Sequence, residues 1–184
     1  MLECKSMATP METNLKLLVD TSSELVDVNL YRQRQIIGSL MYLTNTRPYI
    51  CFSMNTLSQY LVDPRRVHFV TAKHVMRYLK GTLDFGLCYN GDQDFRMISY
   101  TDSDWAGSVS YRKSTSRCFS LGSNMTSWQR RKQSSIALSM AEAEYITACS
   151  ASCEAIWIQK LLTSLFDLKM EATVILCDNQ SWIK

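Results

Sequence analysis

The feature that most constrains how this chain can fold is a change in the spacing of its hydrophobic residues near residue 93. Over residues 29–80 the apolar side chains recur at helical spacing, whereas after residue 95 they alternate with polar ones. A period near 3.6 indicates helices and a period of two indicates strands. The sequence therefore predicts two structural units, a small helical unit over residues 1–93 and an α/β unit over residues 94–184.

The helical unit is predicted to contain three helices, within residues 30–43, 47–61 and 65–82. Pro48 suits the first turn of the second helix, and Lys80 followed by Gly81 is a typical end for the third. The segment after Gly81 has the Gly, Asn and Asp content of turns, with one short strand predicted at Gly86–Tyr89.

The α/β unit is predicted to contain four strands and one long helix. The strands lie within residues 95–102, 114–122, 125–129 and 171–178. The helix follows Ser139 and extends for about 25 residues, which leaves room for a break near Cys153. The run "ATVILC" in the fourth strand is continuously apolar, which is typical of a strand buried on both faces. Three meander strands, a helix and a buried strand predict an α/β sheet whose last strand is parallel to its first.

Composition limits the classes of protein to consider. With 184 residues, 46% of them hydrophobic, the chain can bury a core. It has no run of about 18 apolar residues and no signal-peptide pattern, so we expect no membrane association and an intracellular protein. Its seven cysteines form no C-x-x-C pair, so we expect reduced, mostly packed thiols. Cys149 and Cys153 are four residues apart on the predicted helix but lack a second ligand pair, so they do not indicate a metal site.

Positive charge is concentrated in one part of the chain. The net charge is only +3, but residues 95–138 contain seven basic residues and only two acidic ones, Asp102 and Asp104. Seven minus two leaves a local excess of five positive charges around an acidic pair. Such an excess favours a polyanionic partner.

Asp102 is the first candidate for a functional carboxylate. Strict alternation along the first strand places Ile98, Tyr100 and Asp102 on one face, whose earlier members are apolar. A carboxylate on such a face needs a partner. Asp104 precedes "WAG", where the chain is expected to turn, and Asp is an ordinary turn residue.

Two glutamates at the start of the long helix are predicted to have different roles. Ser139 and Glu142 match the capping box, which satisfies free backbone N–H groups at a helix start. Glu144 is displaced from Glu142 by roughly 200° around the helix. Its neighbours on that face are small, which would let the helix approach a sheet closely: Ala141, Ala148 and Ala151. The alternative is a solvated Glu144 beside a bare alanine face.

Asp178 ends the apolar run of the last strand and so lies at its carboxyl end, where open α/β sheets usually bind their ligands. Its alternative role is the N-cap of a following helix. If the first and last strands are parallel neighbours, Asp102 and Asp178 emerge at the same end of the sheet, and Glu144 can reach between them.

Three converging carboxylates have a chemical consequence. Their charges repel, and each would raise the pKa of the others unless a cation neutralised them. Mg²⁺ or Mn²⁺ is the natural partner of such oxygen ligands. Two such ions about 4 Å apart activate water and stabilise a leaving oxygen in phosphodiester cleavage. The sequence therefore predicts metal-dependent nuclease chemistry, and the basic segment fits a phosphate-backbone substrate.

Basic residues provide candidates for nucleic-acid binding. Four of them, at offsets of seven, eleven and fourteen, form one stripe on the third predicted helix: Arg66, Lys73, Arg77 and Lys80. The others lie in the second unit: Arg112, Lys113, Arg130, Arg131 and Lys132. A plain solvated face is the alternative for the stripe. The rings of Trp105, Trp128 and Trp157 are candidates for stacking on bases, with core packing as their alternative.

Several consecutive motifs resemble a known family. "YTDSDWAGS", "RKSTSRCFSLG", "SWQRRKQSSIALSMAEAEY", "EAIWIQKLL" and "CDNQS" occur in the order found in the ribonuclease H domain of copia-type LTR retrotransposon polyproteins. Upstream, "YRQRQIIGSLMYLTNTRPYICFSMNTLSQYL" and "AKHVMRYLKGTLDFGLCY" resemble the end of the same family's reverse transcriptase. The resemblance extends over essentially the whole chain.

The resemblance implies a ribonuclease H-like mixed sheet preceded by a small helical thumb- or connection-like segment of the reverse transcriptase. It implies cleavage of the RNA strand of RNA–DNA hybrids, with Asp102, Glu144 and Asp178 as catalytic and metal-binding residues and two Mg²⁺ or Mn²⁺ ions in the complete domain. Such enzymes recognise a hybrid by its shape and its 2′-hydroxyl groups. The implied partners are the rest of the Pol polyprotein, namely the polymerase palm and fingers and the integrase. The implied location is a cytoplasmic retrotransposon particle, with a possible nuclear phase.

The sequence also departs from the family pattern. The family's domain continues through another strand and helix with a further acidic ligand, so we expect a sheet truncated after the fourth strand. Arg117 stands where Gly is usual, Tyr49 stands where Asp is usual, and the polymerase Tyr-x-Asp-Asp signature is absent. The alternative function is therefore a catalytically inactive remnant or a nucleic-acid-binding module without turnover. An integrase or transposase core is disfavoured because such cores usually take their glutamate from a later helix.

Overall fold

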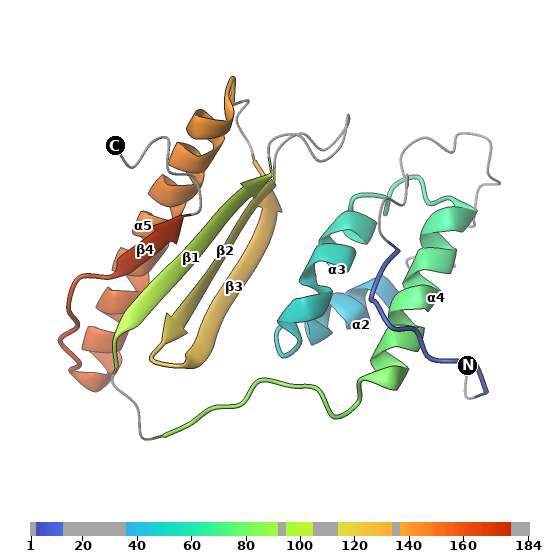
Figure 1. Cartoon of the computed structure of the whole chain (residues 1–184), viewed down its shortest axis with the longest axis horizontal. Coiled ribbons are helices and arrows are strands. Elements are labelled where there is room, and N and C mark those ends of the chain that lie inside the picture. Colours follow the sequence, from blue (N-terminus) through green and yellow to red (C-terminus); the bar gives the residue numbers. More distant parts are fainter. Residues whose placement is uncertain (1–2, 13–35, 92–94, 105–113, 134–136, 178–184) are drawn as a thin grey trace. The chain divides into compact units, whose positions relative to one another are not determined.

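The computed structural model describes residues 3–12, 36–91, 95–104, 114–133 and 137–177. Two compact units divide the chain, Met1–Gly86 and Leu87–Lys184 (Figure 1). The first is helical and the second contains a sheet and a long helix, in agreement with the change of hydrophobic period.

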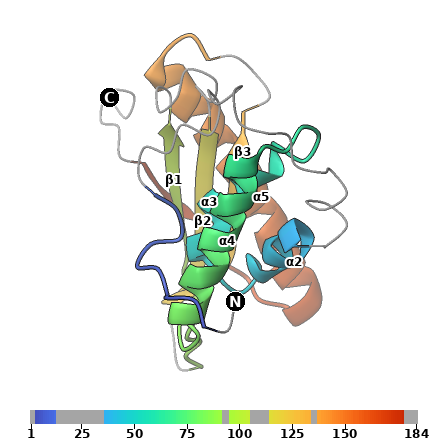
Figure 2. The same ribbon diagram turned by 90° about the vertical axis from the view of Figure 1, so that its right-hand side faces the viewer.

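The first unit contains α2 (Ile36–Leu43), the 3₁₀ helix η1 (Pro48–Ile50), α3 (Cys51–Ser58) and α4 (Arg66–Gly81). Pro48 opens η1, where its fixed φ suits a helix start. The helices α3 and α4 lie side by side (Figure 1 and Figure 2). They enclose an apolar core with α2 and η1: Ile37, Leu40, Ile50, Met54, Leu57, Ala72, Val75 and Tyr78. The helical prediction is confirmed for the described part of this unit.

The second unit contains β1 (Met97–Asp104), β2 (Ser114–Leu121), β3 (Asn124–Lys132), α5 (Met140–Phe166) and β4 (Val174–Cys177). The sheet has the order β3-β2-β1-β4 (Figure 1). The pairs β1–β2 and β2–β3 are antiparallel, whereas β4 is parallel to β1. The prediction of a mixed α/β sheet with parallel first and last strands is confirmed.

Helix α5 covers one face of this sheet (Figure 1 and Figure 2). The core between helix and sheet consists of Met97, Phe119, Ala151, Ala155 and Ile158. Ala148 and Ala151 are buried, so the predicted small-residue face does allow a close approach. Although α5 has 27 residues, neither it nor any other described helix combines the length and the apolar character needed to cross a membrane.

Three details of the prediction are wrong. Residues Gly86–Tyr89 form no strand. Helix α5 is continuous through Cys153, because Ala151, Ala155 and Ile158 recur at helical spacing on the buried face and hold it to the sheet.

The third wrong detail concerns β4, which is buried on one face only. Ile175 packs against the core under α5, whereas 48% of Val174 and 45% of Leu176 is exposed. Their face also carries Tyr100, because in-register residues of parallel strands point to the same side. The apolar run of β4 therefore does not mean that both of its faces are buried. Among the described residues α5 is the helix that packs against the sheet, and it covers one face.

Candidate functional site

Asp102 lies near the carboxyl end of β1, in register with Ser116 of β2. It is exposed, whereas the preceding Thr101 is buried on the face that α5 covers. Asp102 does share a face with Ile98 and Tyr100, as alternation predicts, but 48% of Tyr100 is exposed. The sequence argument that Asp102 needs a partner because its face is apolar therefore fails for the described chain, since a solvated carboxylate needs none.

Strands β1 and β4 end at the same edge of the sheet. Thr101 is in register with Cys177, the last residue of β4. The Thr101 hydroxyl lies 2.8 Å from the Cys177 sulfur and donates a hydrogen bond of 3.3 Å to the carbonyl of Leu176. Asp102 thus follows directly after the position where the parallel pair ends. Asp178 lies outside the described residues.

The start of α5 confirms the predicted role of Glu142. The Ser139 hydroxyl accepts a hydrogen bond of 3.1 Å from the backbone N–H of Glu142. The Glu142 carboxylate in turn accepts one of 2.6 Å from the N–H of Leu138. Ser139 therefore caps the helix as predicted, while Glu142 bonds the N–H of the residue before the N-cap instead of that of Ser139 itself, so only half of the predicted capping box is formed. Glu142 still has a structural contact at the helix start, which leaves Glu144 as the first acidic residue of α5 without one there.

Glu144 is only 6% exposed. The alternative of a solvated Glu144 beside a bare alanine face is therefore wrong. The carbonyl of the preceding Ala143 accepts two side-chain hydrogen bonds, of 2.8 Å from the Thr147 hydroxyl and of 3.0 Å from Gln133 Nε2.

The donor chemistry fits a hard divalent cation in part. Asp102 and Glu144 offer carboxylate oxygens, which Mg²⁺ and Mn²⁺ prefer. Gln133 Oε1 is a buried oxygen without a hydrogen-bond partner in the part of the chain that the structure describes. Within those same residues no three of His, Cys, Asp and Glu gather into a metal-binding group. By strand alternation the Asp102 side chain lies on the face of the sheet opposite to α5, whereas Glu144 lies on α5. Convergence of these two carboxylates with Asp178 therefore remains a prediction.

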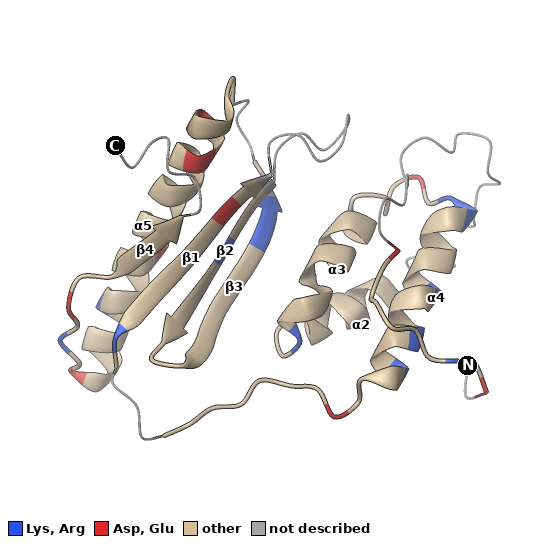
Figure 3. Cartoon of the chain, viewed as in Figure 1, with Lys and Arg blue, Asp and Glu red and all other residues tan. Residues whose placement is uncertain are grey.

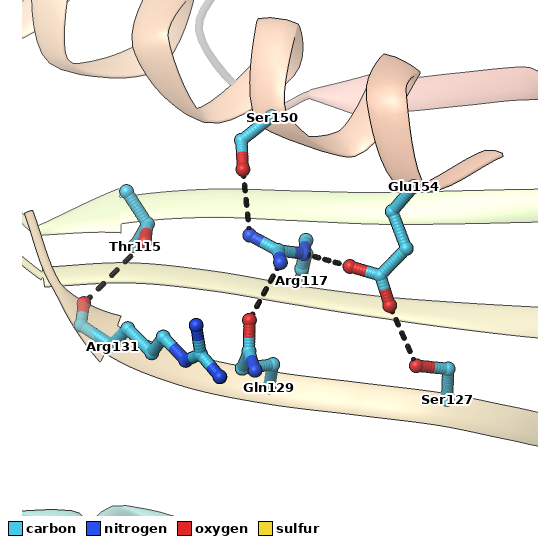
Figure 4. A network of polar contacts seen from close by, with 7 residues as sticks. All are labelled: Thr115, Arg117, Ser127, Gln129, Arg131, Ser150 and Glu154. Carbon is cyan, nitrogen blue, oxygen red and sulfur yellow. Dashed lines mark hydrogen bonds and ion pairs between the residues drawn. The ribbon is translucent and has the colours of Figure 1, made fainter. Parts of the chain in front are cut away.

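Arg117 makes a polar link between sheet and helix that the sequence did not reveal (Figure 4). From β2 its guanidinium pairs with the Glu154 carboxylate and donates 2.8 Å to Ser150 Oγ, both on α5. It also donates 2.5 Å to Gln129 Oε1 on β3, and Ser127 Oγ donates 2.8 Å to Glu154. Only 15% of the Arg117 side chain and 18% of the Glu154 side chain is exposed. Arg117 therefore links the sheet to the helix. Because the Glu154 carboxylate neutralises its guanidinium, Arg117 does not contribute to the local excess of positive charge.

The predicted basic stripe on α4 makes contacts within its own unit. Arg77 Nε donates 2.7 Å to the carbonyl of Lys5, and Lys80 Nζ donates 2.9 Å to that of Cys4. The ammonium of Lys73 lies 4.3 Å from the centre of the Phe69 ring. Arg77 and Lys80 thus tie the N-terminal segment to α4, whereas the Lys73 contact lies within α4. Phosphate binding by the stripe stays a prediction.

Three of the other basic candidates, Arg130, Arg131 and Lys132, follow one another at the carboxyl end of β3 (Figure 3). Arg131 is exposed and Arg130 is half-buried, followed by Lys132 as the last residue of the strand. Arg112 and Lys113 lie outside the described residues. Among the described residues of the predicted basic segment, Arg131 and Arg96 are exposed.

Aromatic and thiol side chains depart in part from expectation. Trp157 is 60% exposed, so it is not a core residue, while Trp128 is half-buried and Trp105 lies outside the described residues. None of the seven cysteines forms a disulfide. Cys88, Cys149 and Cys153 are exposed, so the expectation of packed thiols is wrong for these three.

Comparison with known proteins finds relatives over nearly the whole chain. The chain is 39% identical over 97% of its length to the retrovirus-related Pol polyprotein from transposon RE2 of Arabidopsis thaliana. It is 35% identical over its full length to the corresponding polyprotein from transposon TNT 1-94 of Nicotiana tabacum. It spans only 12% and 14% of these two relatives.

A shorter relative is matched over most of its own length. The chain is 39% identical over 66% of its length to the secreted RxLR effector protein 161 of Plasmopara viticola, of which it covers 87%. No family model and no solved structure matches the chain.

Proposed function

Because the chain belongs to the copia-type family of retrovirus-related Pol polyproteins from transposons, we propose that residues 94–184 are part of a ribonuclease H-like domain. Residues 1–93 are then the C-terminal, thumb- or connection-like part of the reverse transcriptase. Since the chain spans about 12% of the RE2 relative, the proposed partner is the rest of the polyprotein. The proposed reaction is hydrolysis of the RNA strand of RNA–DNA hybrids.

The parallel pairing of β1 with β4 is the observation that supports this proposal most strongly. It brings the carboxyl ends of two strands to one edge, with Thr101 and Cys177 in register there. Helix α5 connects β3 to β4 and carries Glu144 in a buried position. A three-stranded antiparallel meander, a crossover helix and a parallel fourth strand are the arrangement that a ribonuclease H-like sheet requires of these residues.

The proposed chemistry assigns separate tasks to the two described carboxylates. Asp102 is exposed at the sheet edge, so its oxygens are accessible to a hydrated cation and to a phosphate group of the substrate. Glu144 is buried, so its carboxylate offers a fixed charge with little freedom to move. With Asp178 as the third predicted ligand, these residues would hold Mg²⁺ or Mn²⁺. The bound ions would activate water and stabilise the leaving oxygen of the phosphodiester.

The test is a cleavage assay on an RNA–DNA hybrid with a labelled RNA strand. The 184-residue chain should cut the RNA in the presence of Mg²⁺, and EDTA should abolish the cutting. Asp102→Asn should remove the activity, whereas Asp104→Asn, a matched change on the same strand, should retain it. The double-stranded DNA of the same sequence should stay intact.

Two outcomes would contradict the proposal. Equal cutting by the parent chain and by Asp102→Asn would assign the signal to a contaminating nuclease. Binding of the hybrid without any metal-dependent cutting would favour the alternative, a nucleic-acid-binding module without turnover.

A further inference from the structure

The side of α5 that faces away from the sheet carries a charged residue near each end of the helix. Ala151 defines the opposite direction, because it is fully buried in the core between helix and sheet. Nine residues make about 2.5 turns of an α-helix, so Glu142 and Lys160, each nine residues from Ala151, lie directly opposite to it. Both are exposed. This side of α5 is termed the outward face.

Between its two charged residues the outward face carries aromatic, isoleucine and cysteine side chains (Figure 3). At about 100° per residue, six intervening positions lie within about 60° of the outward direction: Tyr145, Ile146, Cys149, Cys153, Ile156 and Trp157. Of these, Tyr145 is 66%, Ile156 52% and Trp157 60% exposed, and both cysteines are exposed. The other charged residues of α5 lie elsewhere, since Glu144 is buried and Glu154 pairs with the sheet.

An apolar outward face indicates a helix that is covered on both sides. The solvent side of a surface helix normally carries charged and polar residues, whereas a helix that is apolar all round is normally buried. Helix α5 already buries its other side against the sheet. Contiguous exposed apolar side chains of this kind mark sites of protein–protein interaction. We therefore expect another protein surface to cover the outward face.

The pattern of the outward face is symmetric about Ala151. Its eight residues form four pairs, nine, six, five and two residues from Ala151 on either side: Glu142 with Lys160, Tyr145 with Trp157, Ile146 with Ile156, and Cys149 with Cys153. Three pairs combine side chains of the same kind, and the outermost pair combines opposite charges. In a twofold contact, each residue of one copy meets its pair mate in the other copy. The outward face is therefore complementary to itself when two such helices run antiparallel.

We propose that the outward face of α5 binds the outward face of α5 in a second copy of this chain, with the helices antiparallel about a twofold axis at Ala151. Glu142 of each copy then lies opposite Lys160 of the other, and Trp157 lies opposite Tyr145. The charges set the direction, because parallel helices would place Glu142 against Glu142 and Lys160 against Lys160, and like charges disfavour a contact. The proposal does not depend on the proposed nuclease activity.

The outer charge pairs also limit the angle between the two helices. Glu142 and Lys160 lie about 13.5 Å from Ala151 along the helix axis, at 1.5 Å per residue. At that distance two helices crossing at about 20° have separated sideways by about 5 Å, and helices crossing at about 50° by about 11 Å. Only the shallow crossing keeps the two side chains within reach. The Glu142 carboxylate accepts from the Leu138 N–H and has further lone pairs for an ammonium group.

Exchange of the charges tests the direction and register, with sedimentation equilibrium on the 184-residue chain as the measurement. Because one helix of each copy makes the contact, we expect the parent to dimerise with a Kd on the order of 10 µM, at the weak end of interfaces. Lys160→Glu and Glu142→Lys each place like charges at both outer pairs, so each should weaken association roughly tenfold or more. An equimolar mixture of these two variants pairs opposite charges at both positions and should form a mixed dimer with parent-like affinity.

The matched control is Lys169→Glu, which makes the same charge change at an exposed lysine beyond the end of α5. It should dimerise as the parent does. Three results would overturn the proposal: a parent chain that stays monomeric at about 200 µM, far above the expected Kd; parent-like association of Lys160→Glu; or no mixed dimer from the two folded variants. Circular dichroism establishes that each variant is folded.

Thiol reactivity in the parent chain tests the same surface without any substitution. Cys149 and Cys153 lie at the centre of the proposed contact, whereas the exposed Cys88 lies outside α5. Raising the protein concentration from about 1 µM to about 100 µM should slow alkylation of Cys149 and Cys153 roughly threefold or more by mass action and leave Cys88 unchanged.

Two alkylation results would overturn the proposal and identify a different occupant. Rapid alkylation of Cys149 and Cys153 at every concentration would leave the outward face to a different protein. Slow alkylation already at the lowest concentration would assign the face to another segment of the same chain.

Discussion

The Thr101 hydroxyl of β1 lies 2.8 Å from the Cys177 sulfur of β4 and donates to the carbonyl of Leu176 at 3.3 Å. This side chain therefore joins the last two residues of an edge strand to the strand that carries Asp102. Because β4 has only four residues, its position at the candidate site depends on a small number of such contacts.

Removal of the Thr101 hydroxyl should lower the stability of the fold, whereas removal of the Ser99 hydroxyl should not. Thr101→Val keeps the shape of the side chain but removes both contacts to β4, so the free energy of unfolding should fall by about 1 kcal/mol. Ser99 is fully buried, and its hydroxyl has no partner in the described part of the chain. Ser99→Ala should therefore leave the stability unchanged or raise it. Urea unfolding followed by circular dichroism measures both. A larger loss in Ser99→Ala than in Thr101→Val would contradict this assignment.

The Arg117–Glu154 ion pair should show strong coupling in a double-mutant cycle. Arg117→Met leaves the Glu154 carboxylate mostly buried with Ser127 as its remaining partner in Figure 4, so we expect a loss of about 3 kcal/mol. The double variant with Glu154→Met should be less destabilised than the sum of the single variants, by about 1–3 kcal/mol. Chemical denaturation of the four proteins gives the coupling energy. Additive losses would mean that the two groups do not depend on each other.

Two glycines of the first unit should differ in their tolerance of a methyl group. A Cβ on Gly81 would lie 2.8 Å from Ser6 Cβ, so Gly81→Ala should displace the N-terminal segment and cost about 1–3 kcal/mol. Gly38 lies in α2, where an added Cβ would have nothing within 4 Å, so Gly38→Ala should stabilise the helix by about 1 kcal/mol. Thermal unfolding measures both changes. Faster trypsin cleavage after Lys5 in Gly81→Ala would report the displacement directly, and parent-like cleavage would speak against it.

The Cys118 thiol should make stability depend on pH in the alkaline range. Burial raises the pKa of Cys118 above its ordinary value, and a backbone hydrogen bond with Tyr100 lowers it to a smaller extent. The folded protein then retains a proton that the unfolded chain loses. The free energy of unfolding should therefore fall as the pH rises from the ordinary thiol value through the raised one.

The control for this pH dependence is Cys118→Ala, in which that part of the slope should disappear. Alkylation followed by mass spectrometry provides a second measurement. The exposed Cys149 and Cys153 should react before Cys118 at mildly alkaline pH. Equal rates at the three thiols would contradict the raised pKa.

The helices and strands whose sequence pattern depends only on nearby residues were predictable from the sequence. The alternation in "RMISYTD" and the helical spacing around Ala148 and Ala151 depend on neighbours within a few residues, so β1 and α5 are where they were expected. The different roles of Glu142 and Glu144 were also predictable, because the angle between them around a helix is fixed by helix geometry. The parallel pairing of β1 and β4 followed from the order of strands and helix.

From the sequence alone the helices of the first unit, the four strands of the sheet, the parallel pairing of β1 with β4 and the position of Glu144 on the sheet-facing side of α5 could be predicted, but the strand predicted at Gly86–Tyr89 is absent. Only the tertiary structure decided that α5 covers the Thr101 face and not the Asp102 face, because alternation defines two faces without saying which is covered. It also decided that Arg117 meets Glu154, 37 residues away, and that Gln133 reaches the Ala143 carbonyl. Such contacts join side chains that are distant in sequence, and their energy depends on burial, which exists only once the helix has packed on the sheet.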